Sequence, residues 1–222
     1  MDRRRSISCA RRWRERTFGI SASPYGSSYP ARFLQTLREL RHEYSGVRLS
    51  IHAGEVDEPN EHVRDTLLLG ADRIGHGIKL ISDDDTMLLM RHGPYLVEIN
   101  LISNLLLEYV SDYSEHPFPE HLRTGIPVAL STDDRGMWDS TMTDEFYVAT
   151  TEFRLSWDEI KALGRNSLEY AFVSREQKEK LLREYNERIQ RFERQMQRRG
   201  IAQLGPMPET RGFVCNRYGL CK

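Results

Sequence analysis

The feature of the sequence that most restricts its fold is a regular alternation of short apolar runs with stretches of helical periodicity. Apolar runs predict four strands, at 47–53, 73–77, 95–101 and 126–132. Apolar residues three or four positions apart predict helices at 30–44, 61–69, 83–91, 143–151 and 157–163, and a long helix after Ser174. Strands that alternate with helices of this length are typical of a parallel sheet built from βα units.

Polar residues recur at the carboxyl end of each predicted strand. His52, His76, Asn100 and Asp133 follow one another at separations of 24, 24 and 33 residues. One βα unit of an eight-stranded barrel takes roughly 25–35 residues, and the carboxyl ends of its strands meet at one mouth. We therefore expect these four side chains to converge, in an α/β fold that forms part of a (β/α)8 barrel.

Size and composition limit the class of protein. The 222 residues are enough for one large domain and borderline for a complete eight-stranded barrel. The formal net charge of -1 provides no field that would attract nucleic acid. No apolar run approaches the roughly 18 residues of a membrane span, so we expect neither nucleic acid nor a membrane as a partner. The three cysteines, Cys9, Cys215 and Cys221, predict neither a disulfide framework nor a cysteine zinc site.

The two ends of the chain differ from its middle. Residues 1–29 are expected to form a basic leader and loop outside the barrel, because seven arginines lie within residues 1–16. A secretory signal needs an apolar stretch after its basic start, and none follows here. This favours the cytoplasm, while an organelle transit peptide and an exported parent stay open. We expect the partial barrel at 30–196 and a loose tail at 197–222.

Two of the strand ends carry residues suited to a metal ion. His52 is followed three residues later by the carboxylate of Glu55. Asp133 and Asp134 are adjacent, so their side chains project in different directions and can serve different partners. Zinc is suited to His and Asp ligands, and catalytic zinc keeps one position open for water. His76, which lies between two glycines, is placed to act on such a water.

Five stretches of sequence carry a family resemblance: SIHAGE at 50–55, GADRIGHG at 70–77, VEINLISNLLL at 97–107, GIPVALSTDD at 125–134 and NSLEYAF at 166–172. In this order they resemble the carboxyl-terminal half of adenosine deaminase and of the adenosine-deaminase-related growth factors. The resemblance implies strands five to eight of a (β/α)8 barrel, with residues 18–22 as a remnant of strand four. Cytidine deaminases need a Pro-Cys-x-x-Cys signature that this sequence lacks.

The resemblance implies zinc-dependent hydrolytic deamination of adenosine and 2′-deoxyadenosine to inosine and ammonia. His52 and Asp133 match zinc ligands of the family. Glu55 matches the acid that delivers a proton to N1 of the purine. His76 matches the residue that orients the attacking water and helps to deprotonate it. These four residues would therefore share one reaction centre.

Two further residues are implied to contact the substrate. Asp134 matches the group that binds N7 of the base, and Gly54 leaves space for a ligand beside the backbone. The implied partner is a small purine nucleoside, and the implied cofactor is Zn²⁺. Attack at C6 breaks the aromaticity of the base, and protonation of N1 relieves the charge that would build there. Glu55 must therefore be protonated in the productive complex.

The sequence also departs from the family in one respect. The family takes two more zinc ligands from a His-x-His pair on its first strand, and this sequence contains no such pair. We therefore expect a truncated barrel without strands one to three. An open half-barrel would expose the strand edges at 47–53 and 126–132, which predicts self-association. Two alternatives stay open: a catalytically inactive half-barrel that pairs with itself or another chain, and a deaminase of a related aminopurine.

Overall fold

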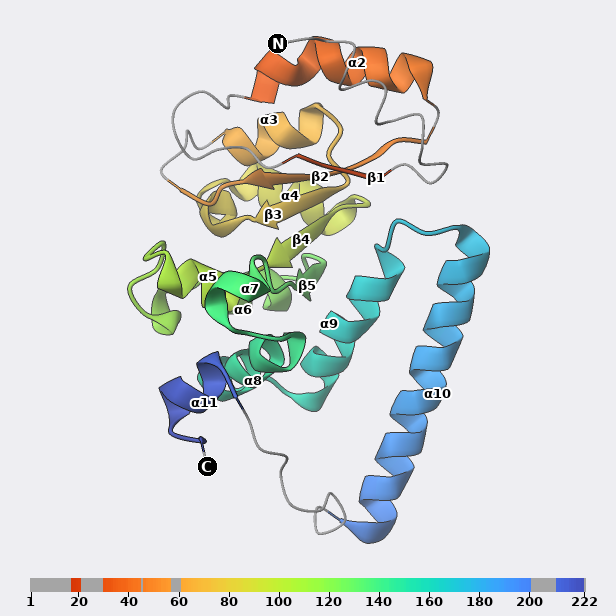
Figure 1. The fold of residues 1–222 in the computed structure, drawn as a ribbon. Helices are drawn as coiled ribbons and strands as arrows, with labels where there is room; N and C mark the ends of the chain where they lie inside the picture. The colour runs from red at the N-terminus through yellow and green to blue at the C-terminus, as the bar shows by residue number, and fades with distance from the viewer. Residues whose placement is uncertain (1–16, 21–29, 45, 57–60, 201–210, 222) are drawn as a thin grey trace.

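The structure is a computed structural model that describes residues 17–20, 30–44, 46–56, 61–200 and 211–221. At its centre lies a sheet of five strands in the order β1-β2-β3-β4-β5, and every neighbouring pair is parallel (Figure 1). The strands are Thr17–Ile20 (β1), Arg48–Ala53 (β2), Arg73–His76 (β3), Leu96–Ile99 (β4) and Val128–Leu130 (β5). The prediction of an α/β fold with the topology of a partial barrel is confirmed.

Helices connect the strands and follow the last one. The α-helices are Leu34–Glu43 (α2), His62–Leu68 (α3), Asp84–His92 (α4), Leu101–Leu106 (α5), Phe118–Arg123 (α6), Arg135–Trp138 (α7), Met142–Phe153 (α8), Trp157–Glu169 (α9), Arg175–Arg199 (α10) and Phe213–Tyr218 (α11). Short 3-10 helices occupy Pro30–Phe33 (η1), Ile78–Ser82 (η2) and Tyr113–Glu115 (η3). Ser156 and Ser174 form capping boxes at the starts of α9 and α10.

A continuous apolar row crosses the sheet and anchors the core. Ile51, Ile74, Val97 and Val128 stand opposite one another on β2 to β5, and all four are buried. Such a row is typical of parallel strands that helices cover. The row just beyond it, one residue toward the carboxyl ends, contains His52. Packing of the apolar row therefore fixes the register that places the polar strand ends side by side.

The sheet begins earlier in the chain than the sequence suggested. β1 pairs with β2 from Thr17 to Ile20, so the sheet extends into residues 1–29, and the predicted remnant strand is present. The prediction that residues 47–53 form an unpaired edge is wrong, because β1 covers β2. At the opposite edge, the Asn166 side-chain amide donates to the Val128 carbonyl of β5 at 2.9 Å. Self-association stays a prediction. Residues 1–16, with the arginine-rich leader, lie outside the described residues.

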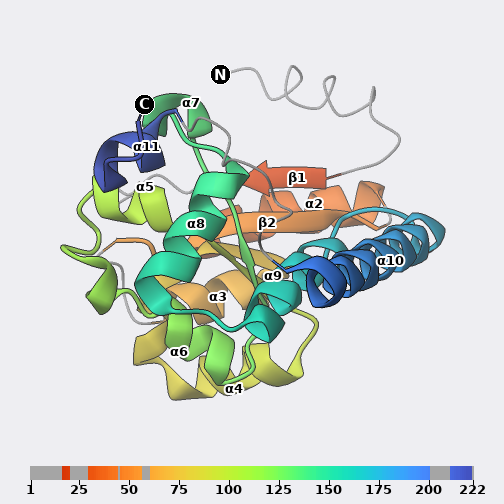
Figure 2. The same cartoon turned by 90° about the horizontal axis from the view of Figure 1, so that it is seen from below.

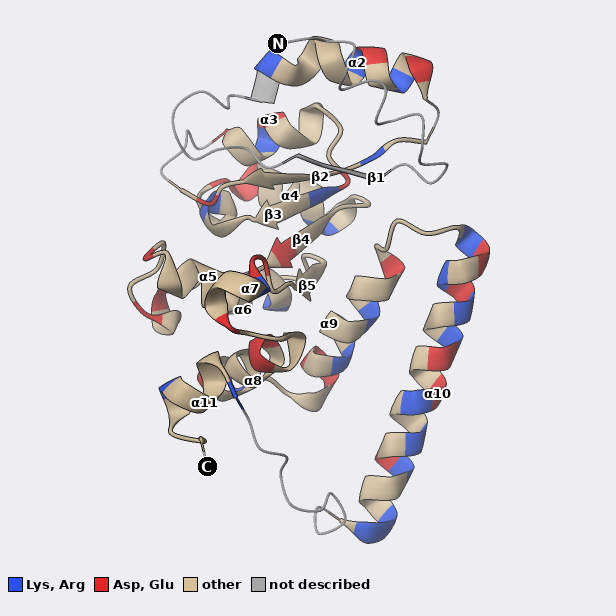
Figure 3. Cartoon of the chain, in the orientation of Figure 1, with Lys and Arg blue, Asp and Glu red and all other residues tan. Residues whose placement is uncertain are grey.

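Helix α10 packs on α9, and not on the sheet. Tyr185 donates its hydroxyl hydrogen to the Lys161 carbonyl at 2.8 Å, and the Phe192 ring lies 5.4 Å from the Trp157 ring. Figure 2 shows α10 projecting to one side of the molecule beside α9, and Figure 3 shows acidic and basic residues intermixed along it. Such intermixed charge is typical of a solvated face. No helix in the described part of the chain is both long and apolar enough to cross a membrane.

The carboxyl-terminal region contains a short helix that the sequence pattern does not predict. Residues 213–218 form α11, which contacts α8 and buries Val214 and Cys215. The prediction of a loose tail is therefore wrong for this segment, because its apolar residues join the core. Cys215 also forms a disulfide with Cys221, which the distribution of cysteines did not indicate. Residues 201–210 lie outside the described part of the chain.

Candidate metal and catalytic site

The end of β2 presents His52 and Glu55 to one side of the sheet. His52 is opposite Gly75 on β3, and a Cβ at Gly75 would lie 2.7 Å from Cδ2 of the His52 ring. Only glycine therefore lets the imidazole lie across β3 as it does here. After the strand, Gly54 adopts a left-handed conformation with φ +66°, and Glu55 follows with its side chain only 11% exposed.

The end of β3 places His76 in the centre of the site. His76 itself has a left-handed backbone with φ 66°, which is unusual for a residue with a side chain. Gly77 is left-handed as well, its N–H donates to the Ala53 carbonyl at 3.1 Å, and His121 Nε2 lies 3.2 Å from its carbonyl. These contacts hold the turn, so His76 is fully buried and has a fixed position.

The end of β5 contributes Asp133. Its backbone is also left-handed, with φ 48°. Ser103, which is buried on α5, donates its hydroxyl hydrogen to Asp133 Oδ2 at 2.7 Å. The Asp133 N–H in turn donates to Ser131 Oγ at 3.4 Å. Two of the strand ends thus carry a candidate site residue on a strained backbone, an arrangement that clusters at functional sites.

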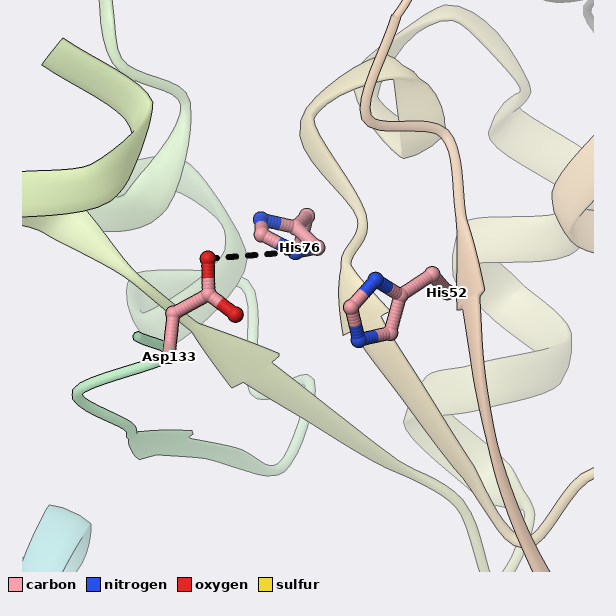
Figure 4. Close-up of side chains that lie close together, drawn as sticks. All are labelled: His52, His76 and Asp133. Atoms are coloured by element: carbon pink, nitrogen blue, oxygen red, sulfur yellow. Dashed lines mark ion pairs between the residues drawn. The ribbon is translucent and has the colours of Figure 1, made fainter. Parts of the chain in front are cut away.

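These strand ends converge as the sequence predicts. One ligand atom from each of His52, His76 and Asp133 lies within 4.8 Å of the others, and Figure 4 shows the three side chains turned toward one another. Glu55 Oε1 lies 3.3 Å from His76 Nε2, and Glu55 Oε2 lies 3.8 Å from His52 Nδ1. His76 Nε2 is 4.0 Å from Asp133 Oδ2. Two imidazoles and two carboxylates therefore share one small volume at the carboxyl ends of the sheet.

Burial controls the electrostatics of the site. Desolvation, and to a smaller extent the neighbouring His52, lower the pKa of His76 to about 3. The His76 ring is therefore neutral at pH 7. A neutral imidazole can donate one hydrogen bond and accept one, so its orientation decides which nitrogen meets a ligand.

The donor set fits a metal ion. His52 and Asp133 offer an imidazole nitrogen and a carboxylate oxygen, and both side chains are partly exposed, at 31% and 16%. Nitrogen and oxygen donors of these types suit zinc. The hydrogen bond from Ser103 orients the Asp133 carboxylate, as the outer shell of a metal site commonly does.

Two predicted substrate-binding residues lie at the margin of this group. Asp134 is the exposed N-cap of α7, and its carboxylate is outside the group of possible metal ligands among the described residues. At Gly54, a Cβ would lie 2.8 Å from Val63 Cγ2, so α3 fills that side of the backbone. The substrate-binding roles of both residues stay predictions.

Several polar residues behind His76 were missed as functional candidates. Asn104 on α5 and His116 after η3 are both buried, and Asn104 contacts His76 at 2.9 Å. Asn100, at the end of β4, lies over the same ring, so it converges on His76 as the sequence predicts. The available signal was the pair Ser103-Asn104 within an otherwise apolar helix, because polar side chains on a buried helix need partners.

Comparison with known proteins identifies the family. A family model described as Adenosine deaminase matches residues 6–188, well over half of the chain. The chain belongs to the adenosine deaminase family. The match begins at residue 6, within the arginine-rich segment that composition alone sets apart from the barrel.

Curated relatives of this deaminase family match only part of their own length. Adenosine deaminase from Enterococcus faecalis is 37% identical over 135 residues, which cover 61% of this chain and 40% of that protein. Adenine deaminase from Rhodopseudomonas palustris is 33% identical over 184 residues, which cover 81% of this chain and 52% of that protein. The chain therefore spans roughly half or less of the length of these relatives.

Solved structures agree on the fold. Adenine deaminase from Arthrobacter aurescens matches with a TM-score of 0.70 and 27% identity, over 78% of this chain and 52% of that one. An amidohydrolase from Burkholderia ambifaria, solved with bound zinc, matches with a TM-score of 0.74 over 85% of this chain and 54% of that one. At 19% identity the second likeness shows the fold alone. The adenosine-deaminase-type partial barrel is thus established by sequence and structure together.

Proposed function

We propose that this chain carries the carboxyl-terminal part of the active site for zinc-dependent deamination of adenosine and 2′-deoxyadenosine to inosine and ammonia. One observation carries the proposal. The Glu55 carboxylate contacts both imidazoles, at 3.3 Å from His76 Nε2 and 3.8 Å from His52 Nδ1, and Asp133 Oδ2 lies 4.0 Å from the same His76 nitrogen. An acid, a metal-binding pair and a water-orienting imidazole are the groups that this reaction needs in one place.

His52 and Asp133 would hold the zinc ion, which when bound makes water a stronger nucleophile at neutral pH. His76 orients the attacking water, because its ring is buried, neutral and fixed on the strained end of β3. Glu55, once protonated, gives its proton to N1 of the purine as water adds to C6. One hydrogen of the added water then passes to the exocyclic nitrogen, and the other restores the acid form of Glu55. The bond from C6 to that nitrogen breaks as C6 becomes a carbonyl carbon, and ammonia leaves.

The neighbouring residues would select the substrate. Asp134 is exposed beside Asp133, and in its protonated form it would donate a hydrogen bond to N7 of the purine. The Arthrobacter and Rhodopseudomonas relatives are adenine deaminases, and the Rhodopseudomonas match extends over the larger share of this chain, 81% against 61% for the Enterococcus enzyme. Free adenine is therefore the second candidate substrate.

The test supplies the zinc ligands that this sequence lacks. Residues 30–222 are fused to the amino-terminal part of the Enterococcus faecalis adenosine deaminase that lies outside the matched region. The fusion is loaded with zinc, and loss of adenosine, 2′-deoxyadenosine, adenine and AMP is followed by ultraviolet absorbance and chromatography. We expect turnover of adenosine and 2′-deoxyadenosine to inosine and 2′-deoxyinosine.

Two variants separate catalysis from folding in that fusion. Glu55→Gln should lower turnover by at least ~10³-fold while zinc stays bound, because it removes the transferable proton without removing a ligand. Glu61→Gln, an exposed glutamate at the start of α3, serves as the matched control and should leave turnover unchanged. Near-normal turnover in Glu55→Gln would remove Glu55 from the mechanism. A folded, zinc-loaded fusion that deaminates none of the four compounds would favour the catalytically inactive alternative.

A further inference from the structure

A chain of hydrogen bonds runs behind His76, away from the open side of the site. The Phe118 backbone N–H donates to His116 Nδ1 at 3.1 Å. His116 Nε2 lies 3.0 Å from Asn104 Oδ1, and Asn104 Nδ2 lies 2.9 Å from His76 Nδ1. All three side chains are at most 3% exposed. Solvent therefore has little access to these bonds.

The donor and acceptor roles along this series of hydrogen bonds are fixed at the Phe118 end, because a backbone N–H can only donate. His116 Nδ1 therefore accepts from Phe118 and carries no proton. His116 is left with its proton on Nε2, which donates to the oxygen of the Asn104 amide. The amide nitrogen of Asn104 then faces His76 Nδ1, and it can only donate. His76 Nδ1 must accept and is unprotonated, so the proton of the His76 ring is on Nε2.

Burial supports the first step of this argument. Desolvation, and to a smaller extent His121 and His76, lower the pKa of His116 to about 3. His116 is therefore neutral at pH 7 and has a single ring proton to place. The alternative, in which both of its nitrogens donate, is excluded at that pH.

Asn100 does not change the outcome. Its Nδ2 lies 3.1 Å from Nδ1 and 3.3 Å from Nε2 of the same His76 ring. An atom almost equally far from both ring nitrogens lies along the lone pair of neither. Asn104, which contacts Nδ1 alone, is the partner that sets the tautomer.

The other side of the ring agrees with this assignment. His76 Nε2 faces Glu55 Oε1 at 3.3 Å and Asp133 Oδ2 at 4.0 Å, and both are carboxylate oxygens that accept hydrogen bonds. A proton on Nε2 is therefore directed at acceptors. A bare Nε2 in the same place would put its lone pair against two carboxylates.

We propose that Asn104 and His116 are positioning residues that hold His76 as the tautomer with its proton on Nε2, so that His76 presents an N–H to the reaction centre. In this tautomer Nε2 has no free lone pair, and His76 is a hydrogen-bond donor and not a third metal ligand. The importance of this tautomer for catalysis rests on the proposed function, in which the Nε2–H group of His76 donates a hydrogen bond to water or to Glu55 and so orients it. The tautomer itself does not depend on any activity.

The experiment measures the tautomer directly. The zinc-free 222-residue chain is labelled with ¹⁵N-histidine at pH 7, and long-range ¹H–¹⁵N correlation distinguishes protonated from unprotonated ring nitrogens. His76→Gln assigns the resonances. We expect His76 Nδ1 at the shift of an unprotonated nitrogen and Nε2 at the shift of a protonated one. A proton on His76 Nδ1 in the unsubstituted chain would overturn the proposal, whether or not the protein deaminates adenosine.

Asn104→Asp tests the role of these hydrogen bonds with almost no change in the shape of the side chain. A carboxylate accepts at both ends, so His76 Nδ1 should gain a proton and its ¹⁵N resonance should move to the protonated range. A merely structural Asn104 would leave the tautomer as it was, and an unchanged Nδ1 in the folded variant would contradict its assigned role. Asn186→Asp, the same substitution at an exposed position of α10, is the control and should keep Nδ1 unprotonated. If Asn104→Asp does not fold, the tautomer of the unsubstituted chain decides the proposal.

Discussion

The His52 ring lies edge-on to the His76 ring, with centroids 4.7 Å apart and planes inclined by 74°. The two rings come from adjacent strands, and only the missing side chain of Gly75 lets them approach in this way. His76 is buried within the sheet, whereas the His52 side chain is 31% exposed. The pair thus consists of a fixed inner ring, His76, and an outer ring, His52, that a metal ion can reach.

Gly75→Ala should displace the outer ring. The new methyl group would lie 2.7 Å from His52 Cδ2, so the imidazole must rotate away from the other ligand atoms. We expect zinc affinity to fall by at least about tenfold, as happens when the orientation of a ligand is lost. Competition with a chromophoric chelator measures the affinity. Gly136→Ala, where a Cβ meets open space, is the control, and equal affinities in the two variants would contradict the prediction.

Ser103→Ala should weaken the site from the Asp133 side. The hydroxyl is buried and donates to Asp133 Oδ2 at 2.7 Å, so its removal frees a carboxylate held on a strained backbone. Loss of such a supporting hydrogen bond typically costs 10–100-fold in metal affinity. The same chelator assay should show a loss of about tenfold. Ser111→Ala, an exposed serine beyond α5, should have no effect, and an unaltered affinity in Ser103→Ala would mean that Asp133 needs no such support.

The sequence made the fold predictable because each strand end combines an apolar run with a polar residue. In such a pair the apolar residue marks the buried row and the polar residue marks the edge of the sheet where the candidate site lies. Examples are Ile51 with His52 and Leu130 with Asp133. The edges of the sheet were less predictable. Residues 17–20 form a short strand within a region of mixed composition, and pairing with β2 defines it more than its own pattern does.

The residues that converge at the strand ends could be named from the sequence, but the residues that support them could not. His52 and His76 lie in the last two residues of their strands, and Glu55 and Asp133 follow theirs within three residues, so topology brings the four together. His116 lies 40 residues beyond His76, in an irregular connection, and its contact with Asn104 arises only from tertiary packing. A lone buried histidine carries no pattern by which sequence periodicity would reveal its partner.

Glu145 should make stability decrease as the pH rises. This glutamate on α8 is fully buried, and desolvation raises its pKa from 4.5 to about 8, although it accepts a hydrogen bond from the Leu101 N–H at 3.0 Å. Below about pH 4.5 the carboxyl group is protonated in both the folded and the unfolded chain. Between that pH and about 8, only the folded chain keeps the proton, so stability is progressively lost. The loss is at most about 5 kcal/mol, since one pKa unit corresponds to about 1.4 kcal/mol.

Glu145→Gln isolates this effect, because an amide resembles the neutral acid in shape and can still accept from Leu101. The free energy of unfolding is measured by urea titration from pH 5 to 8 in both proteins. The difference between variant and unsubstituted chain should grow in favour of the variant as the pH rises. Buried histidines with lowered pKa values act at lower pH and cancel in this difference. Glu120→Gln, an exposed glutamate, is the control; a difference independent of pH in Glu145→Gln would show that Glu145 titrates normally.

The 222-residue chain by itself should bind zinc weakly and should not measurably deaminate adenosine. His52 and Asp133 supply two ligands, and the tautomer proposed for His76 withholds a third, whereas catalytic zinc sites have three or more protein ligands. The sequence has no His-x-His pair to complete the set. We expect a dissociation constant of roughly micromolar or weaker, read from bound metal after dialysis and from chelator competition.

His52→Ala should abolish even this weak zinc binding, while His92→Ala, at an exposed histidine at the end of α4, should not. Stoichiometric zinc with clear turnover would show that the missing ligands come from elsewhere, and light scattering would then establish whether a second copy of the chain supplies them.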